Sequence, residues 1–173
     1  MTKKFFDNLR PQLLSPVVVS DPAEELANIE RRIGIRLPPL YAFLLLEYQA
    51  PIIFEEDVEF IPMQRSPWDG EDGLQSLEIV FGLGKDVYSV SHMLDRYRDR
   101  MPDGVIPIGE APFGNIIVLG TKGDVAGKVF FWDHEDEREI TGDKQLDYGN
   151  MYLIAESLEN FLNRLQPGDD DDV

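Results

Sequence analysis

Two histidines are the side chains of this chain that could act as a base near neutral pH. His134 lies in the run Asp-His-Glu-Asp-Glu at 133–137, directly after a series of large apolar residues. Beside these carboxylates it could be a general base or a ligand of a divalent metal. Alternatively, the run is a turn whose charged residues face water, with His134 bonded to a neighbouring backbone group. No second histidine stands at ligand spacing and no calcium-loop pattern fits, so we expect neither a metal nor a cofactor.

His92 lies between Ser91 and Met93 near the start of an expected helix, and we interpret it as a half-exposed helix residue. Two neighbouring carboxylates could catalyse glycoside hydrolysis, with the ring of a tryptophan stacking on the sugar. With 33 acidic residues in the chain, however, any fold brings some carboxylates together, so this pattern carries little weight. Trp132 ends an apolar run and fits the core. Trp68 lies in a polar loop, where it is either an interface residue or folded back on the sheet.

Phosphate-binding loops are absent from the sequence. Phe81–Lys85 contains two glycines after an expected strand but lacks the third glycine of either nucleotide-binding spacing. The basic residues of 96–100 are balanced by Asp95 and Asp99, so we expect no direct contact with nucleic acid. The chain has no cysteine, which excludes thiol catalysis and disulfides. No catalytic residue is therefore assigned.

The charge is the strongest feature of the composition. The 33 acidic and 16 basic residues give a net charge of −17, and leaving out the four aspartates at 169–172 still gives −13. A field of this sign repels nucleic acid and anionic membranes and attracts basic proteins. Acidity that serves only solubility is the alternative explanation.

One α+β domain is expected over residues 1–166, with its core at about 22–165, followed by a disordered acidic tail at 167–173. A chain of 173 residues buries roughly 70% of its unfolded surface and needs no disulfide or metal to fold. The N-terminus lacks the apolar region of a signal peptide, and the most apolar run, 40–46, is too short to cross a bilayer. We therefore expect a cytoplasmic protein, a monomer or a weak dimer, that does not bind membranes.

The expected elements are N-terminal helices, a middle helix and a C-terminal helix around a largely antiparallel sheet. Asp21 caps a first helix that Pro22 opens and Gly34 ends, and a second helix runs from Pro38 to about Tyr48. Ser89 or Ser91 caps a third helix. A last helix follows an amphipathic pattern over Tyr152–Leu165. Strands are expected at 58–61, 77–83, 105–108, 115–119 and 128–132, the last three as an antiparallel meander.

Five short motifs in a fixed order resemble the SUKH superfamily, the Smi/Knr-type domain of fungal cell-wall regulators and many bacterial toxin-immunity proteins. They are Gly34–Pro38, the helix residues Tyr41, Phe43 and Leu44, then Ile106–Gly109, Gly114–Asn115 and Val129–His134. The resemblance runs from about Pro22 to Leu165. One departure follows the second helix, where an Asn-Gly-Gly-like turn of the family is replaced by Gln49-Ala50-Pro51.

The resemblance implies a protein-binding module and not an enzyme. Bacterial members look like immunity proteins that bind and block a cognate toxin, often a nuclease or deaminase with a basic substrate groove, which suits an acidic inhibitor. Two alternatives stay open, a regulatory module that binds a cellular enzyme and a hydrolase hidden among the carboxylates. We expect the contact surface to include two loop clusters: Trp68, Asp69, Glu71 and Asp72, and Asp133, Glu135, Asp136 and Glu137.

Overall fold

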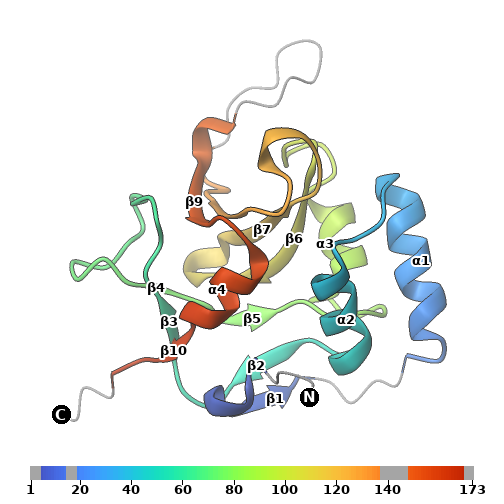
Figure 1. The fold of residues 1–173 in the computed structure, drawn as a ribbon, viewed down its shortest axis with the longest axis horizontal. Helices are drawn as coiled ribbons and strands as arrows, with labels where there is room; N and C mark the ends of the chain where they lie inside the picture. The colour runs from blue at the N-terminus through green and yellow to red at the C-terminus, as the bar shows by residue number, and fades with distance from the viewer. Residues whose placement is uncertain (1–4, 15–18, 137–147, 170–173) are drawn as a thin grey trace.

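The computed structural model describes residues 5–14, 19–136 and 148–169. This part of the chain forms a seven-stranded antiparallel sheet in the order β1-β2-β5-β6-β7-β8-β9 and a three-stranded sheet in the order β10-β3-β4 (Figure 1). The strands are β1 (Pro11–Leu13), β2 (Ile52–Phe54), β3 (Val58–Phe60), β4 (Gln75–Ser76), β5 (Ile79–Val80), β6 (Val105–Glu110), β7 (Ile116–Gly120), β8 (Val129–Trp132), β9 (Met151–Ala155) and β10 (Gln166–Pro167). The helices are α1 (Pro22–Ile33), α2 (Pro39–Tyr48), α3 (Val90–Arg96) and α4 (Leu158–Arg164), with 3₁₀ turns η1 (Asp7–Leu9), η2 (Pro112–Gly114), η3 (Gly123–Val125) and η4 (Tyr148–Asn150). The predicted α+β class is confirmed.

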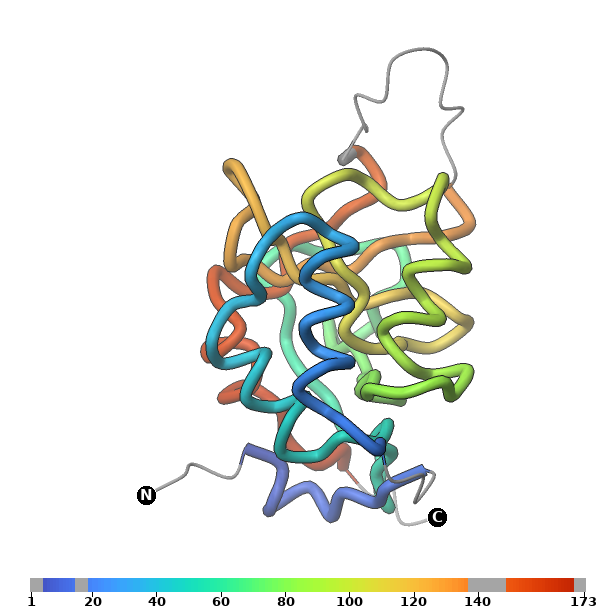
Figure 2. Tube along the Cα trace, turned by 90° about the vertical axis from the view of Figure 1, so that its right-hand side faces the viewer, coloured from blue at the N-terminus to red at the C-terminus, as the bar shows by residue number. Residues whose placement is uncertain are grey.

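Helix α1 begins and ends where its capping residues predict. The Asp21 carboxylate accepts a hydrogen bond from the backbone N–H of Glu24, and Pro22 occupies the first helical position. Gly34 ends the helix in the left-handed conformation with its N–H bonded to the Glu30 carbonyl. Figure 2 shows α1 lying between α2 and α3, the two helices that it contacts.

Helix α2 ends in a strained turn at the position where the family pattern differs. Gln49 follows the helix with φ 58° and ψ −54°, and the N–H of Ala50 bonds to the Tyr48 carbonyl over 2.6 Å. This is a γ-turn with positive φ, a conformation that residues with a side chain rarely adopt. Gly82 lies against this turn, where an added Cβ would stand 2.4 Å from the carbonyl carbon of Ala50. The chain therefore keeps the tight turn without an asparagine or glycine at its centre.

The centre of the main sheet is the predicted meander of β6, β7 and β8, and it is confirmed. Every residue of β7 is buried, which requires cover on both faces of the sheet. Pro107 lies inside β6, where it cannot donate a hydrogen bond, and the register shifts between Pro107 and Gly109. The bulge lets the central strand accommodate the proline.

Helices cover both faces of the sheet and contact different residues of β7 and β8. Trp132 is fully buried and meets the Tyr97 ring, which follows α3, edge to face at 5.2 Å between centroids. On the opposite face, Ile117 lines a small apolar cavity with Tyr41 of α2 and Phe161 of α4. Trp132 is thus a core residue, as the sequence predicted.

The prediction of a last helix over Tyr152–Leu165 is wrong in its first part. Residues Met151–Ala155 form β9, which pairs with β8, and helix α4 begins only after Ser157, whose hydroxyl accepts from the N–H of Asn160. The apolar spacing continued across two elements because Ile154 faces the same core as the helix. The segment forms a strand and not a helix because it pairs with β8, which is distant in the sequence.

The N-terminal and C-terminal edges also differ from the prediction. β1 and β2 were not predicted, and they pair with each other at the edge of the main sheet. The expected strands at 58–61 and 77–83 are shorter than predicted. At the C-terminus, β10 pairs with β3, and the Gly168 N–H donates to the Asp57 carbonyl at 2.7 Å. These contacts include Pro167 and Gly168, the first two residues of the expected tail.

Candidate functional site

The two predicted loop clusters meet in the structure. The indole Nε1 of Trp68 donates a hydrogen bond to the Oδ2 atom of Asp133 over 2.8 Å, joining residues 65 positions apart. Trp68 belongs to the long loop between β3 and β4, and Asp133 follows β8 directly. A single side-chain contact thus turns two separate acidic segments into one continuous site.

The register of the sheet brings a third loop to the same place. Ile116 at the start of β7 pairs with Trp132 at the end of β8. The turn that precedes β7, η2, therefore lies beside Asp133, since antiparallel partners stand directly opposite each other. Phe113 of this turn packs on Trp68 with ring centroids 5.5 Å apart and an angle of 36° between the rings.

The loop that carries Trp68 is held by a polar network at its base. The Ser66 hydroxyl donates to Asp69 Oδ1 at 2.7 Å and accepts from the Trp68 N–H at 3.1 Å. The Gln75 amide donates to the Ser66 hydroxyl at 2.6 Å and also bonds to Asp69. Asp69 is half-buried, and its Oδ2 atom has no hydrogen-bond partner among the described residues. The Asp69 carboxylate therefore holds the base of the loop together through its bonds to Ser66 and Gln75.

Farther along the loop, Asp72 shapes the tip while remaining exposed. Its Oδ1 atom accepts from the Leu74 N–H at 2.9 Å, and the Gly70 N–H bonds to the Leu74 carbonyl at 2.9 Å. An aspartate that bonds the backbone two residues on is a common turn-forming device. The acidic tip is consequently ordered.

Asp133 plays a comparable part in the turn after β8. Only 5% of this residue is exposed, and its Oδ1 atom accepts from the N–H groups of Glu135 at 3.0 Å and Asp136 at 3.3 Å. The Asn150 amide donates to the carbonyls of Asp133 and Asp136 and ties the turn to η4. The buried carboxylate is thus satisfied by backbone donors and the Trp68 indole, as a buried charge requires.

His134 is fixed by a side chain instead of by the backbone group that the sequence suggested. Its Nδ1 atom lies 3.0 Å from the Oδ1 of Asn115, and its N–H donates to the same oxygen at 3.3 Å. An amide oxygen only accepts, so this contact is a hydrogen bond in the tautomer that carries a proton on Nδ1. Asn115 is fully buried. His134 therefore fastens the acidic turn to the start of β7.

Phe113 is the member of the site that the sequence analysis missed. It is 74% exposed and has φ 65°, which residues other than glycine, asparagine and aspartate seldom adopt. An aromatic residue between Pro112 and Gly114 in a turn was the available signal, since a core phenylalanine normally lies within a helix or strand. The turn holds its ring out over Trp68.

The structure places the predicted site residues differently with respect to solvent. Glu71, Asp72, Glu135 and Asp136 are exposed, Trp68 and Asp69 are half-buried, and Asp133 is buried. Glu137 lies outside the described residues. We call the accessible set the aromatic–acidic face, and it consists of Trp68, Glu71, Asp72, Phe113, Glu135 and Asp136.

Two glutamates near the face are held at raised pKa values. Burial is the main cause of the raised pKa of Glu110 and of Glu78, with Glu78 adding to the shift of Glu110 and Asp57 to that of Glu78. Arg96 acts in the opposite direction on Glu110. Each pKa is therefore raised first by burial and second by a neighbouring carboxylate.

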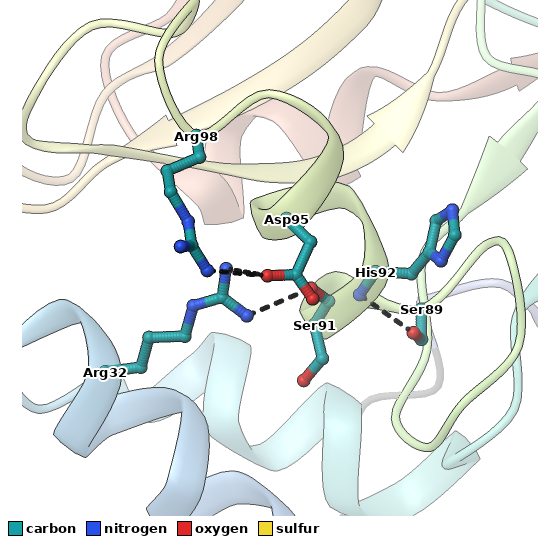
Figure 3. Close-up of polar contacts among 6 residues, drawn as sticks. All are labelled: Arg32, Ser89, Ser91, His92, Asp95 and Arg98. Carbon is teal, nitrogen blue, oxygen red and sulfur yellow. Dashed lines mark hydrogen bonds and ion pairs between the residues drawn. The ribbon is translucent and has the colours of Figure 1, made fainter.

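A second polar cluster joins α1 to α3 (Figure 3). Asp95 accepts from Arg32 at 2.7 Å and from Arg98 at 2.9 Å, and the hydrogen bond from Arg32 is the main cause of its lowered pKa. The ring of His92, an exposed residue at the start of α3, points away from these groups in Figure 3. A hollow of about 400 Å³ beside this cluster is lined by Arg32, Arg98 and Lys122. Because Asp95 already pairs with both guanidinium groups, we interpret the cluster as a joint between helices.

Among the described residues, no group of three histidine, aspartate or glutamate side chains is arranged to hold a metal ion. In the same part of the chain, none of the helices has the length and apolar character needed to cross a bilayer.

The fold and the loop-built face define a small α+β domain with two N-terminal helices, an antiparallel sheet and a C-terminal helix. The family model of the SMI1 / KNR4 family (SUKH-1) matches residues 22–164. The SPbeta prophage-derived uncharacterized protein YokK of Bacillus subtilis (strain 168) is 34% identical over 148 residues, covering 80% of this chain and 71% of that protein. The chain belongs to the SMI1 / KNR4 (SUKH-1) family, as its motifs predicted.

Proposed function

We propose that this protein is a non-catalytic immunity protein, which binds and neutralises a cognate bacterial toxin through the aromatic–acidic face. The observation that carries the proposal is the Trp68–Asp133 hydrogen bond, which joins two acidic loops around the half-buried Trp68 and the exposed Phe113. Exposed aromatic side chains ringed by polar groups are typical of protein interfaces. Membership of a family with immunity proteins supports the same role.

The charge of the chain favours a toxin of the nuclease or deaminase class. Such enzymes bind nucleic acid through basic grooves, and a protein of net charge −17 is attracted to a basic groove over a long range. The exposed carboxylates of Glu71, Asp72, Glu135 and Asp136 would take the place of phosphates. Trp68 and Phe113 would supply the desolvated centre of the interface.

Capture of the partner tests the proposal. The protein is immobilised, exposed to lysate of the native organism, and washed at low and then high salt, and the released proteins are identified by mass. We expect a basic toxin domain that elutes with salt, and its nuclease or deaminase activity should fall when the purified protein is added in equimolar amount. Recovery of a cell-wall or housekeeping enzyme would favour a regulatory module instead and would contradict the immunity role.

A further inference from the structure

A hollow of about 210 Å³ opens beside the aromatic pair of the face. It is smaller than the roughly 300–1,000 Å³ of sites that take small molecules, and its size suits one long side chain. Its lining includes three aromatic and two acidic residues: Trp68, Phe113, Phe131, Glu59 and Asp72. The exposed Phe113 ring, which packs on the half-buried Trp68, marks this hollow as a surface that a partner would cover.

Phe113 is the residue whose presence the fold does not explain. Its ring is 74% exposed, so it contributes little to the core, and its positive φ is unfavourable for a phenylalanine. Glycine or asparagine would fit this backbone position better. A strained aromatic residue that remains exposed at the rim of a hollow is better explained by what it contacts in a complex.

The two kinds of lining group have one common ligand. Aromatic faces attract cations through their quadrupole, and carboxylates pair with them directly. Arginine satisfies both, because its planar guanidinium stacks on a ring while its edge donates two parallel hydrogen bonds to a carboxylate. The lysine ammonium is a compact and strongly hydrated charge, which gains less from an aromatic wall.

We propose that this hollow receives an arginine side chain of the protein partner, with its guanidinium against the Trp68–Phe113 pair and hydrogen-bonded to Asp72. The inference rests on the proposed function in one respect, that the partner is a protein with a basic surface. Charge complementarity supports this occupant, since the acidic residues Asp72 and Glu59 line the hollow. The aromatic–acidic face would then bind a basic groove through one specific arginine contact in addition to long-range electrostatic attraction.

The test uses the full chain and two small probes, N-acetyl-arginine amide and N-acetyl-lysine amide, at constant ionic strength. The chain has two tryptophans, and the indole N–H resonance of Trp68 is assigned in NMR spectra by its loss in Trp68→Phe. We expect the arginine probe to shift this resonance in a saturable way in the millimolar range, as suits a ligand of few atoms. The lysine probe should bind at least about threefold more weakly.

Matched variants separate the hollow from the general charge of the surface. Asp72→Asn keeps an oxygen for the Leu74 N–H, and Glu71→Gln makes the same change of charge one position away from a residue that lines the hollow. We expect Asp72→Asn and Phe113→Leu each to weaken the arginine probe by about threefold or more, and Glu71→Gln to have a smaller effect.

Equal shifts by the two probes, or equal effects of Asp72→Asn and Glu71→Gln, would overturn the inference. The amide spectrum of each variant shows whether it is folded, so loss of the fold is recognised separately. A toxin that is captured and inhibited by a protein without preference for the arginine probe would leave the proposed function standing. Conversely, if the protein prefers the arginine probe but captures no toxin, the immunity role is contradicted and the arginine site in the hollow stands.

Discussion

Trp68 connects the core of the molecule to its surface at the scale of a single residue. Its indole N–H is one of the donors that satisfy the buried carboxylate of Asp133, and its ring supports the exposed Phe113. Burying a charged group is unfavourable unless donors surround it, so the bond fixes both partners in place. The Trp68–Asp133 bond therefore helps to hold the β3–β4 loop over the sheet, together with the backbone bonds of Met63 and Gln64 to β9.

Replacing Trp68 by phenylalanine should destabilise the protein by about 1.5–3 kcal/mol, because the buried Asp133 carboxylate loses a donor. The free energy of unfolding is measured by urea denaturation at neutral pH. Phe113→Asn is the matched control for loss of the aromatic pair, and it should leave stability unchanged or raise it by about 1 kcal/mol, since asparagine tolerates the positive φ. Equal destabilisation by both changes would show that ring packing, and not the hydrogen bond, holds the loop.

At the scale of elements, capping residues and turns could be predicted from the sequence, whereas pairing between distant segments could not. Asp21, Gly34 and Ser89 mark helix ends through contacts within a few residues, and these predictions hold. β9 was mistaken for helix because its few apolar residues continue the spacing of α4. A short apolar run fits either state, and its pairing with β8 is a long-range contact that local patterns do not contain.

The γ-turn at Gln49 gives a direct test of strain at the end of α2. Gln49→Gly should raise the free energy of unfolding by about 1 kcal/mol, because glycine adopts positive φ without a steric penalty. The same change at Gln12, an exposed residue of β1, serves as the control and should not raise the free energy of unfolding. A destabilised Gln49→Gly protein would mean that the glutamine side chain makes contacts worth more than the strain.

The carboxylate of Glu110, at the end of β6, predicts a dependence of stability on pH. The pKa of Glu110 is raised in the folded protein, so its contribution to stability is present below its unfolded pKa and is lost as pH rises through the folded value. Glu110→Gln should therefore stabilise the protein at about pH 7 and have less effect at about pH 3.5, where the unfolded glutamate is also protonated. Urea unfolding at the two pH values measures the difference, and an equal effect at both would contradict the raised pKa.

At the scale of the whole molecule, the sequence predicted the sign of the surface and its two acidic loops, but not how they fit together. Trp68 was equally compatible with an exposed interface residue and a residue folded onto the sheet, and the structure gives it a half-buried position between these. Phe113 was missed because its exposure follows from the register of β7 on β8 and from a backbone angle. The composition predicts the negative electrostatic field of the protein, whereas the positions of the site residues depend on the fold.

The net charge makes binding of a basic partner fast and sensitive to salt. Two pairs of charge reversals separate the face from the overall charge. Glu71→Lys with Glu135→Lys changes the face, and Glu47→Lys with Asp124→Lys makes the same change in net charge on other exposed parts of the chain, α2 and η3. A role of the face in particular requires the first pair to have the larger effect.

The most direct measurement is therefore the affinity of the captured toxin for the wild type and the two double variants, at low and high salt. We predict that the change at Glu71 and Glu135 weakens binding by at least about tenfold at low salt and flattens its salt dependence, while the change at Glu47 and Asp124 has a much smaller effect. Equal losses for the two variants, or unchanged affinity and salt dependence for the first, would contradict binding through the aromatic–acidic face.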